Sequence, residues 1–120
     1  MGTFTVALTL EGPTGESARV DALVDTGSTY AVIPASLLDR LGVLRRDRMS
    51  FRLADERMVD YDLGETVADI DGRRMTVPVV FGPDDAEALL GAVTLEIFGM
   101  SADPVNQRLV PVPGLLKGRR

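Results

Sequence analysis

The chain has 120 residues, a length that predicts one compact domain over residues 1–120. Its 13 Lys and Arg against 18 Asp and Glu give a formal net charge of −5, which opposes binding to nucleic acid or to an anionic membrane. The chain contains no His and no Cys, which excludes Ser-His and Cys-His nucleophile pairs, thiolate chemistry and the usual zinc sites. A catalytic group must therefore be a carboxylate, a hydroxyl, an amine or the backbone.

The composition is that of an ordinary folded chain, with 45% hydrophobic and 26% charged residues. Residues 1–6 show neither the basic region nor the long apolar run of a secretory signal. Because cysteine is absent, no disulfide is possible, as is usual for proteins of the cytosol. We therefore expect a cytoplasmic protein.

The first third of the chain predicts a β-hairpin followed by a polar loop. Apolar and polar side chains alternate over residues 3–10 with the period of two expected of a half-buried strand. Turn-forming residues occupy 11–15, and alternation resumes over residues 17–24. Residues 25–29 then form a tight polar loop before a second apolar stretch at 30–33.

The rest of the chain predicts further short strands and two short helices. Pro34, a stripe of leucines and Gly42 indicate a helix over about residues 34–41, and a second helix is expected over residues 94–98. Between residues 49 and 81, strand-like segments are broken at 54–57 and at Asp71-Gly72, which predicts two more hairpins. We expect a last strand at 109–112 and a basic tail over residues 117–120. Frequent turns between short strands favour an all-β barrel or sandwich.

The loop after residue 24 is the candidate for chemistry. An acid, a small hydroxyl residue and a glycine directly after a buried strand would hold the Asp25 carboxylate at a defined place, with Gly27 allowing close approach of a substrate. A simpler interpretation makes Asp25 an Asx-turn residue that bonds only to its own loop. Asp21 and Asp69 lie on the polar phase of their strands and are predicted to be solvated.

Two motifs carry a resemblance to a known family. The stretch Ala22-Leu23-Val24-Asp25-Thr26-Gly27-Ser28 resembles the active-site loop of aspartic proteases. Farther on, Ala88-Leu89-Leu90-Gly91 is similar to the element that passes behind that loop in the retropepsin-like branch. Gly91 lies 66 positions after Asp25, a separation that suits one retropepsin-type subunit, and residues 102–112 are similar to the end of small prokaryotic single-domain members.

The resemblance implies an all-β, closed acid-protease (retropepsin-like) barrel with one or two short helices. It implies an aspartic endopeptidase that works as a homodimer on peptide or protein substrates. Asp25 would meet its counterpart across a twofold axis, with Thr26 bonding to the partner's loop. Gly27 would lie beneath the substrate and Ser28 would steady Asp25. No metal and no organic cofactor is expected, because the nucleophile is water.

Other residues are assigned less direct roles. Residues 51–59 occupy the place of the family's flap, the hairpin that closes over substrate. The tip would consist of Ala54, Asp55, Glu56 and Arg57, which lacks the usual glycine, so an ordinary exposed hairpin is the alternative. Leu90 and Gly91 would support the active-site loop, Gly91 by permitting close passage. Leu89, Leu90 and Leu95 are expected in the core rather than in a specificity pocket.

The same residues have three alternative interpretations. Residues 25–29 also match the D-x-G-x-T phosphate loop of actin-like ATPases, but that fold needs two large α/β domains. A phospho-aspartyl motif fails because its lysine and an alternating strand and helix pattern are missing. The third alternative is a retropepsin-like domain that binds peptides or assembles with partners without cleaving them, because a fold does not guarantee activity.

Overall fold

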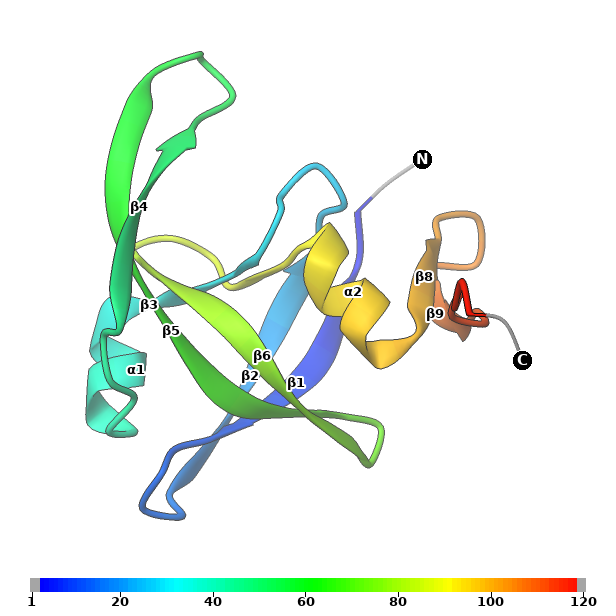
Figure 1. The fold of residues 1–120 in the computed structure, drawn as a ribbon, viewed down its shortest axis with the longest axis horizontal. Coiled ribbons are helices and arrows are strands. Elements are labelled where there is room, and N and C mark those ends of the chain that lie inside the picture. The colour runs from blue at the N-terminus through cyan, green and yellow to red at the C-terminus, as the bar shows by residue number, and fades with distance from the viewer. Residues whose placement is uncertain (1–2, 119–120) are drawn as a thin grey trace.

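The computed structural model describes residues 3–118, in which β-strands predominate and two short helices pack against them (Figure 1). Arg119 and Arg120 of the predicted basic tail and the first two residues of the chain lie outside this range. The elements in chain order are β1 (Thr5–Glu11), β2 (Ser17–Val24), β3 (Ala31–Pro34), α1 (Ala35–Arg40), β4 (Asp47–Arg52), β5 (Met58–Ile70), β6 (Arg73–Gly82), β7 (Leu89–Leu90), α2 (Ala92–Phe98), β8 (Met100–Asp103) and β9 (Arg108–Pro111).

The main sheet closes on itself. Its strand order is β1-β2-β7-β3-β6-β5-β4, and β1 also pairs with β5. Six strands therefore form a ring, whereas β4 lies outside the ring and pairs only with β5 among the described strands. The expectation of an all-β, closed sheet with one or two short helices is confirmed. Because the sheet closes, each of the six ring strands pairs with a neighbour on both sides over part of its length.

The predicted hairpins are present and local chemistry explains them. At the β5–β6 turn both central residues have positive φ, 52° at Asp71 and 86° at Gly72, as a type I′ turn requires. The carboxylate of Asp69 accepts a hydrogen bond of 2.9 Å from the Gly72 N–H. Both Asp21 and Asp69 were predicted to be solvated. Asp21 is exposed, whereas Asp69 is half-buried and bonds to its own turn.

The core lies inside the ring and beneath α2. The alternation of β1 buries Leu8 and Leu10, and Phe98 of α2 is 1% exposed. Leu90 and Leu95 are buried, as expected, whereas Leu89 is only partly buried. Each fully buried side chain of this size contributes about 1.5–3 kcal/mol of hydrophobic stabilisation.

The C-terminal part differs from the sequence-based expectation. A single last strand was expected there, but β8 and β9 form a separate two-stranded sheet. The Asp103 carboxylate organises the turn between them, because it accepts hydrogen bonds from the N–H groups of Val105 and Asn106 at 3.1 and 3.3 Å. Helix α2 also begins at Ala92, two residues before its predicted start.

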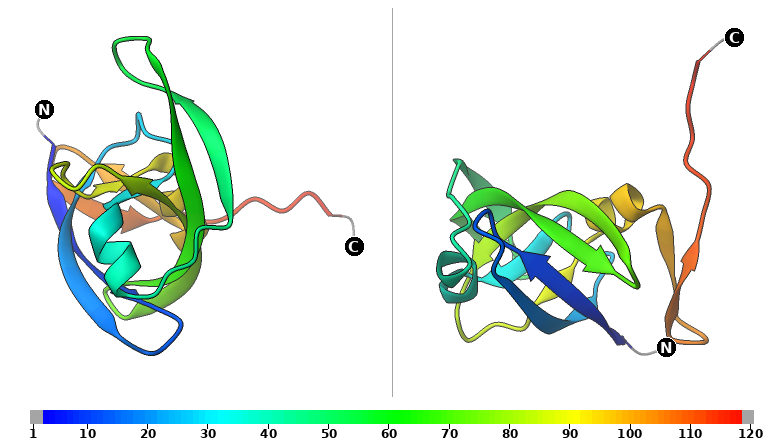
Figure 2. Two further views of the ribbon diagram at one scale, coloured as in Figure 1. Left: turned by 90° about the vertical axis from the view of Figure 1, so that its left-hand side faces the viewer. Right: turned by 90° about the horizontal axis from the view of Figure 1, so that it is seen from below.

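Two segments extend from the body of the molecule. The β4–β5 hairpin rises well above the ring, and the chain after β9 runs away from it (Figure 2). Within residues 3–118, neither helix has the length and apolar character needed to cross a membrane.

Candidate active site

Asp25 lies at the point where β2 leaves the sheet. β2 pairs in parallel with β7, with Val24 opposite Leu90. The backbone N–H of Asp25 then donates a hydrogen bond of 3.0 Å to the Leu90 carbonyl oxygen. The start of the loop is therefore fixed by a strand that comes from the other end of the sequence.

The Asp25 carboxylate is held by its own loop. The carboxylate Oδ1 accepts a hydrogen bond of 3.0 Å from the Gly27 N–H, and the backbone carbonyl oxygen of Asp25 accepts one of 3.1 Å from the Ser28 N–H. This is the Asx-turn of the simpler interpretation, and it leaves Oδ2 free of hydrogen bonds from the described residues. A Cβ at Gly27 would lie 3.2 Å from Asp25 Oδ1, so glycine suits this contact.

The other loop residues occupy distinct surroundings. Thr26 and Gly27 are exposed, while Asp25 and Ser28 are partly buried. The resemblance led us to expect that Ser28 steadies Asp25. Among the hydrogen bonds of residues 3–118, Ser28 serves Asp25 through its backbone N–H rather than through its hydroxyl.

Gly91 packs directly behind the loop. A Cβ on this residue would lie 2.5 Å from the Tyr30 carbonyl oxygen and 2.7 Å from that of Ser28. These are backbone atoms that cannot rotate away, so only glycine fits without displacing the loop. Leu90, which is fully buried, anchors the same segment in the core.

The first turn of α2 completes the support of the loop. The N–H of Ala92 donates to the Ser28 carbonyl at 2.8 Å, and the N–H of Val93 donates to the Thr29 carbonyl at 2.9 Å. These two N–H groups have no partner inside the helix, so the loop satisfies them. Sequence reasoning missed both contacts, because backbone donors leave no signature in residue type.

The loop opens onto a cleft of about 730 Å³ between the ring and the β4–β5 hairpin. The cleft is lined by Asp25, Gly27, Ser28, Thr29, Tyr30, Val32, Met49, Ser50, Phe51, Arg52, Leu53, Ala54, Tyr61 and Val80. Among residues 3–118, Asp25 is the only carboxylate that lines the cleft, and most of the other lining side chains are apolar or aromatic. Leu89, Leu90 and Leu95 do not line it, as expected of core residues.

An aromatic cluster in the cleft was not predicted. The rings of Tyr30 and Phe51 meet edge to face at 6.2 Å between centroids, and those of Phe51 and Tyr61 lie 6.3 Å apart. The sequence held a signal for Phe51 and Tyr61. In the β4–β5 hairpin Tyr61 lies opposite Met49, and Phe51 is two residues after Met49, so both aromatic side chains lie on the same face. The cluster joins the hairpin to the active-site loop.

The predicted hairpin tip is present, with a charged residue where glycine is usual. Glu56 has a φ of 72°, a left-handed conformation that favours glycine. The Arg57 side chain donates to the Asp55 carboxylate at 2.7 Å, and this bond holds the pKa of Asp55 below its usual range. All four tip residues, Ala54 to Arg57, are exposed, and among them Ala54 lines the cleft.

Within residues 3–118 no group of three or more acidic side chains is placed to hold a metal ion. The cleft offers a single carboxylate in a largely apolar surrounding. The β4–β5 hairpin forms one wall of the cleft, which is otherwise open to solvent. A carboxylate held in this way in a cleft of a closed sheet fits an aspartic-type hydrolase.

Comparison with known proteins agrees with this class. A family model described as "Aspartyl protease" matches residues 6–94, most of the chain, and includes the Asp25 loop and Gly91. The chain therefore belongs to the aspartyl protease family. Among curated proteins, no sequence matched the chain.

Solved structures of retropepsin type share the fold. The simian foamy virus protease matches with a TM-score of 0.57 and 17% identity, over 77% of this chain and 91% of that one. EIAV protease, solved with an inhibitor, matches with a TM-score of 0.59 and 16% identity, over 82% and 89%. A retropepsin-like aspartic protease from Rickettsia conorii gives 0.54 and 17%, over 87% and 91%.

Proposed function

We propose that this chain is one subunit of a homodimeric aspartic endopeptidase that hydrolyses peptide bonds with a water activated by two Asp25 carboxyls, one from each subunit. The observation that supports the proposal best is the placement of Asp25. Its carboxylate is fixed through Oδ1 by the Gly27 N–H and faces a cleft of about 730 Å³. No other acid in the described part of the chain lines this cleft.

The chemistry explains the need for a second copy. One group must take a proton from the attacking water, while another must donate a hydrogen bond or a proton to the carbonyl oxygen of the substrate. A single carboxylate cannot do both at once. Two carboxyls within hydrogen-bond distance share one proton, because ionising both is unfavourable, so the pair offers a base and an acid together.

The proposed dimer has a twofold axis beside the active-site loops. Thr26, which is exposed, would bond to the loop of the second copy, and strands near the termini would add to the interface. Gly27 would lie under the substrate backbone. The β4–β5 hairpin, with Ala54 to Arg57 at its tip, would close over the peptide and exclude water.

The substrate in this proposal is an extended peptide whose apolar side chains enter the cleft beside Tyr30 and Phe51. Neither a metal nor an organic cofactor takes part. We place the dimer in the cytoplasm, because a chain without cysteine suits a reducing compartment. The acidic net charge makes nucleic acid or an anionic membrane surface an unsuitable partner.

A peptide library incubated between about pH 4 and pH 7 tests the proposal, because the shared proton of a carboxyl pair restricts activity to a pH window. We expect cleavage that pepstatin-type inhibitors block and that Asp25→Asn abolishes. Asp21→Asn is the matched control, because Asp21 is an exposed aspartate on β2 outside the cleft. Cleavage that survives Asp25→Asn would refute the assignment. A protein that stays monomeric and binds peptides without cutting them would support the non-catalytic alternative.

A further inference from the structure

The β4–β5 hairpin has an identifiable pivot. Residues 63–70 of β5 pair with β6, from Leu63 opposite Val80 to Ile70 opposite Arg73. Residues 58–63 pair with β4, from Met58 opposite Arg52 to Leu63 opposite Asp47. Leu63 is therefore the residue at which β5 leaves the ring. Beyond it, no ladder within residues 3–118 joins the hairpin to the body.

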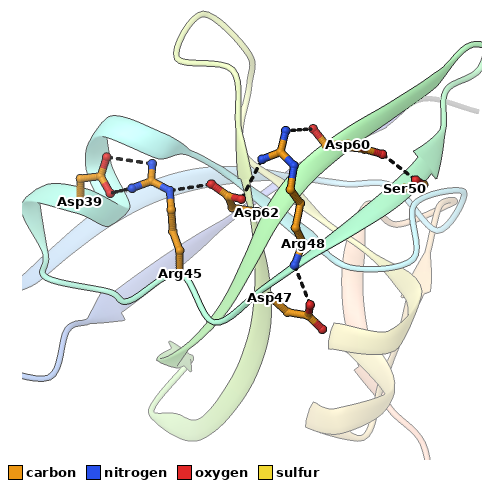
Figure 3. A network of polar contacts seen from close by, with 7 residues as sticks. All are labelled: Asp39, Arg45, Asp47, Arg48, Ser50, Asp60 and Asp62. Carbon is orange, nitrogen blue, oxygen red and sulfur yellow. Dashed lines mark hydrogen bonds and ion pairs between the residues drawn. The ribbon is translucent and has the colours of Figure 1, made fainter.

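Arg45 connects the two sides of this pivot. It lies in the segment between α1 and β4, and its guanidinium donates two hydrogen bonds to Asp39 of α1, at 2.7 and 3.0 Å. Its Nε lies 2.9 Å from Oδ2 of Asp62, the first residue of the hairpin beyond Leu63. Figure 3 shows Arg45 between the two carboxylates, with one on the helix and the other on β5.

The position of Arg45 is itself fixed by the ring. Its guanidinium carbon lies 4.5 Å from the centroid of the Phe81 ring, a buried side chain of β6. The next residue, Arg46, donates its backbone N–H to the Leu63 carbonyl at 2.8 Å. A Cβ at Gly64 would lie 2.5 Å from the Leu44 carbonyl oxygen, so the segment crosses β5 in close contact.

The network continues along the hairpin. Arg48 of β4 lies 2.8 Å from the second oxygen of Asp62, and its guanidinium also reaches the Asp60 carbonyl at 3.4 Å. The Ser50 hydroxyl donates to the Asp60 carboxylate. A continuous series of polar contacts therefore runs from α1 to the part of β4 that lines the cleft (Figure 3).

We propose that Arg45 is a positioning residue that holds the β4–β5 hairpin at a set angle over the Asp25 cleft, by joining Asp39 of the body to Asp62 beside the pivot. The proposal deepens the proposed function and, in its catalytic part, rests on it. The hairpin is a long lever: at roughly 3.3 Å per residue, the seven steps along the chain from Leu63 to Glu56 span about 23 Å, so a rotation of about 10° moves the tip by about 4 Å.

The exposure of the pairs fits this role. The side chains of Arg45 and Asp39 are 43% and 47% exposed, and that of Asp62 is 28% exposed. Ion pairs at such a surface contribute little to folding, but a bidentate arginine fixes an orientation. The restraint should also weaken as salt screens the charges. The exposure of these ion pairs therefore favours a role in fixing the angle of the β4–β5 hairpin over a role in stabilising the core.

The absence of cysteine permits a direct measurement of the hairpin angle. Spin labels are attached to Ala54→Cys at the tip and Thr14→Cys in the exposed β1–β2 turn, and labelled protein is diluted with unlabelled protein to remove signals between subunits. We expect the distribution of tip-to-body distances to broaden in Arg45→Met. Arg46→Met is the matched control, because the Arg46 side chain approaches Glu65 on the ring part of β5, at 3.8 Å, and the substitution keeps the backbone N–H that bonds to Leu63, so the distribution should stay unchanged.

Peptide cleavage gives the second measurement. Arg45→Met should raise KM about tenfold and leave kcat within about twofold, since the hairpin binds substrate and does not touch the reacting atoms. The KM of Arg45→Lys should lie between those of the original protein and Arg45→Met. High salt should raise the KM of the original protein toward that of Arg45→Met.

An unchanged distance distribution in Arg45→Met would overturn the proposal whatever the activity, as would equal broadening in Arg46→Met. If the distribution broadens as expected but no form cleaves peptides, the proposed function fails while the positioning of the hairpin stands.

Discussion

The backbone N–H of Asp25 donates to the carbonyl of Leu90 at 3.0 Å, which joins the end of β2 to a strand that lies far away in the sequence. The residue after Leu90 then passes so close to the loop that a side chain has no room. Support for the candidate catalytic residue thus comes from the core, through backbone contacts.

Gly91→Ala should destabilise the fold and impair the site together. The added Cβ would lie 2.5 Å from the Tyr30 carbonyl oxygen, so the loop must move or the helix must shift. We expect the free energy of unfolding to fall by about 2–3 kcal/mol, measured by urea denaturation. Gly114→Ala is the control, because nothing lies within 4 Å of a Cβ there. Equal stability of the two variants would contradict the close packing.

The sequence predicted the local parts of the fold well. Asp71-Gly72 and the alternation over residues 3–10 specify their hairpins through turn chemistry and periodicity, which act over a few residues. The family resemblance located the Asp25 loop and Gly91. The insertion of β7 between β2 and β3 was out of reach of periodicity, because Leu89 of β7 pairs with both Leu23 and Val32 across long stretches of chain.

Other parts of the site depend on the same kind of long-range contact. Arg45 and Asp62 are ordinary surface charges in the sequence, and only the crossing of the segment over β5 brings them together. β8 was missed because Met100–Asp103 has only four residues, too few for alternation to identify a strand, and its burial depends on packing beside α2. Periodicity cannot report contacts that the closed sheet creates.

Glu56→Gly should stabilise the tip of the β4–β5 hairpin. Glu56 has a φ of 72°, which costs a residue with a side chain about 1 kcal/mol relative to glycine. The greater freedom of glycine in the unfolded chain offsets part of the gain, so we expect about 0.5 kcal/mol. Slower hydrogen exchange of the Leu53 and Glu56 amides, which bond across the tip, would report it. Glu56→Ala removes the charge but keeps the backbone strain, and should show no such slowing.

Thr94→Val should stabilise the protein. Thr94 is 0% exposed, and its hydroxyl has no hydrogen-bond partner within residues 3–118. Valine has nearly the same shape without the buried hydroxyl, so we expect a gain of about 1 kcal/mol in the free energy of unfolding. Thr94→Ser keeps the hydroxyl and removes a methyl group, and should be destabilising. A loss of stability in Thr94→Val would show that the hydroxyl has a partner.

Thr26→Val should weaken dimerisation under the proposed function. Thr26 is exposed beside Asp25, where a hydroxyl could bond to the loop of a second copy. Loss of such bonds at a buried symmetric contact should raise the dimer dissociation constant about tenfold or more. Sedimentation equilibrium would measure the change. Thr26→Ser retains the hydroxyl and should dimerise nearly as well as the original chain; identical constants for all three proteins would place Thr26 outside the interface.

The β8–β9 turn should lose stability at low pH. The side-chain amide of Asn106 bonds to the Asp103 carboxylate at 2.9 Å and, with N–H groups of the turn and Arg108, holds the pKa of Asp103 below its ordinary value of 3.8. A carboxyl with a lowered folded-state pKa stabilises the fold fully above the unfolded-state pKa, and this contribution disappears as the pH falls through the folded-state pKa. The turn should therefore loosen only below about pH 4, and NMR of the Val105 and Asn106 amides should follow it. Asp103→Asn should remove this pH dependence, and a turn that loosens at the same pH in that variant would show that another group is responsible.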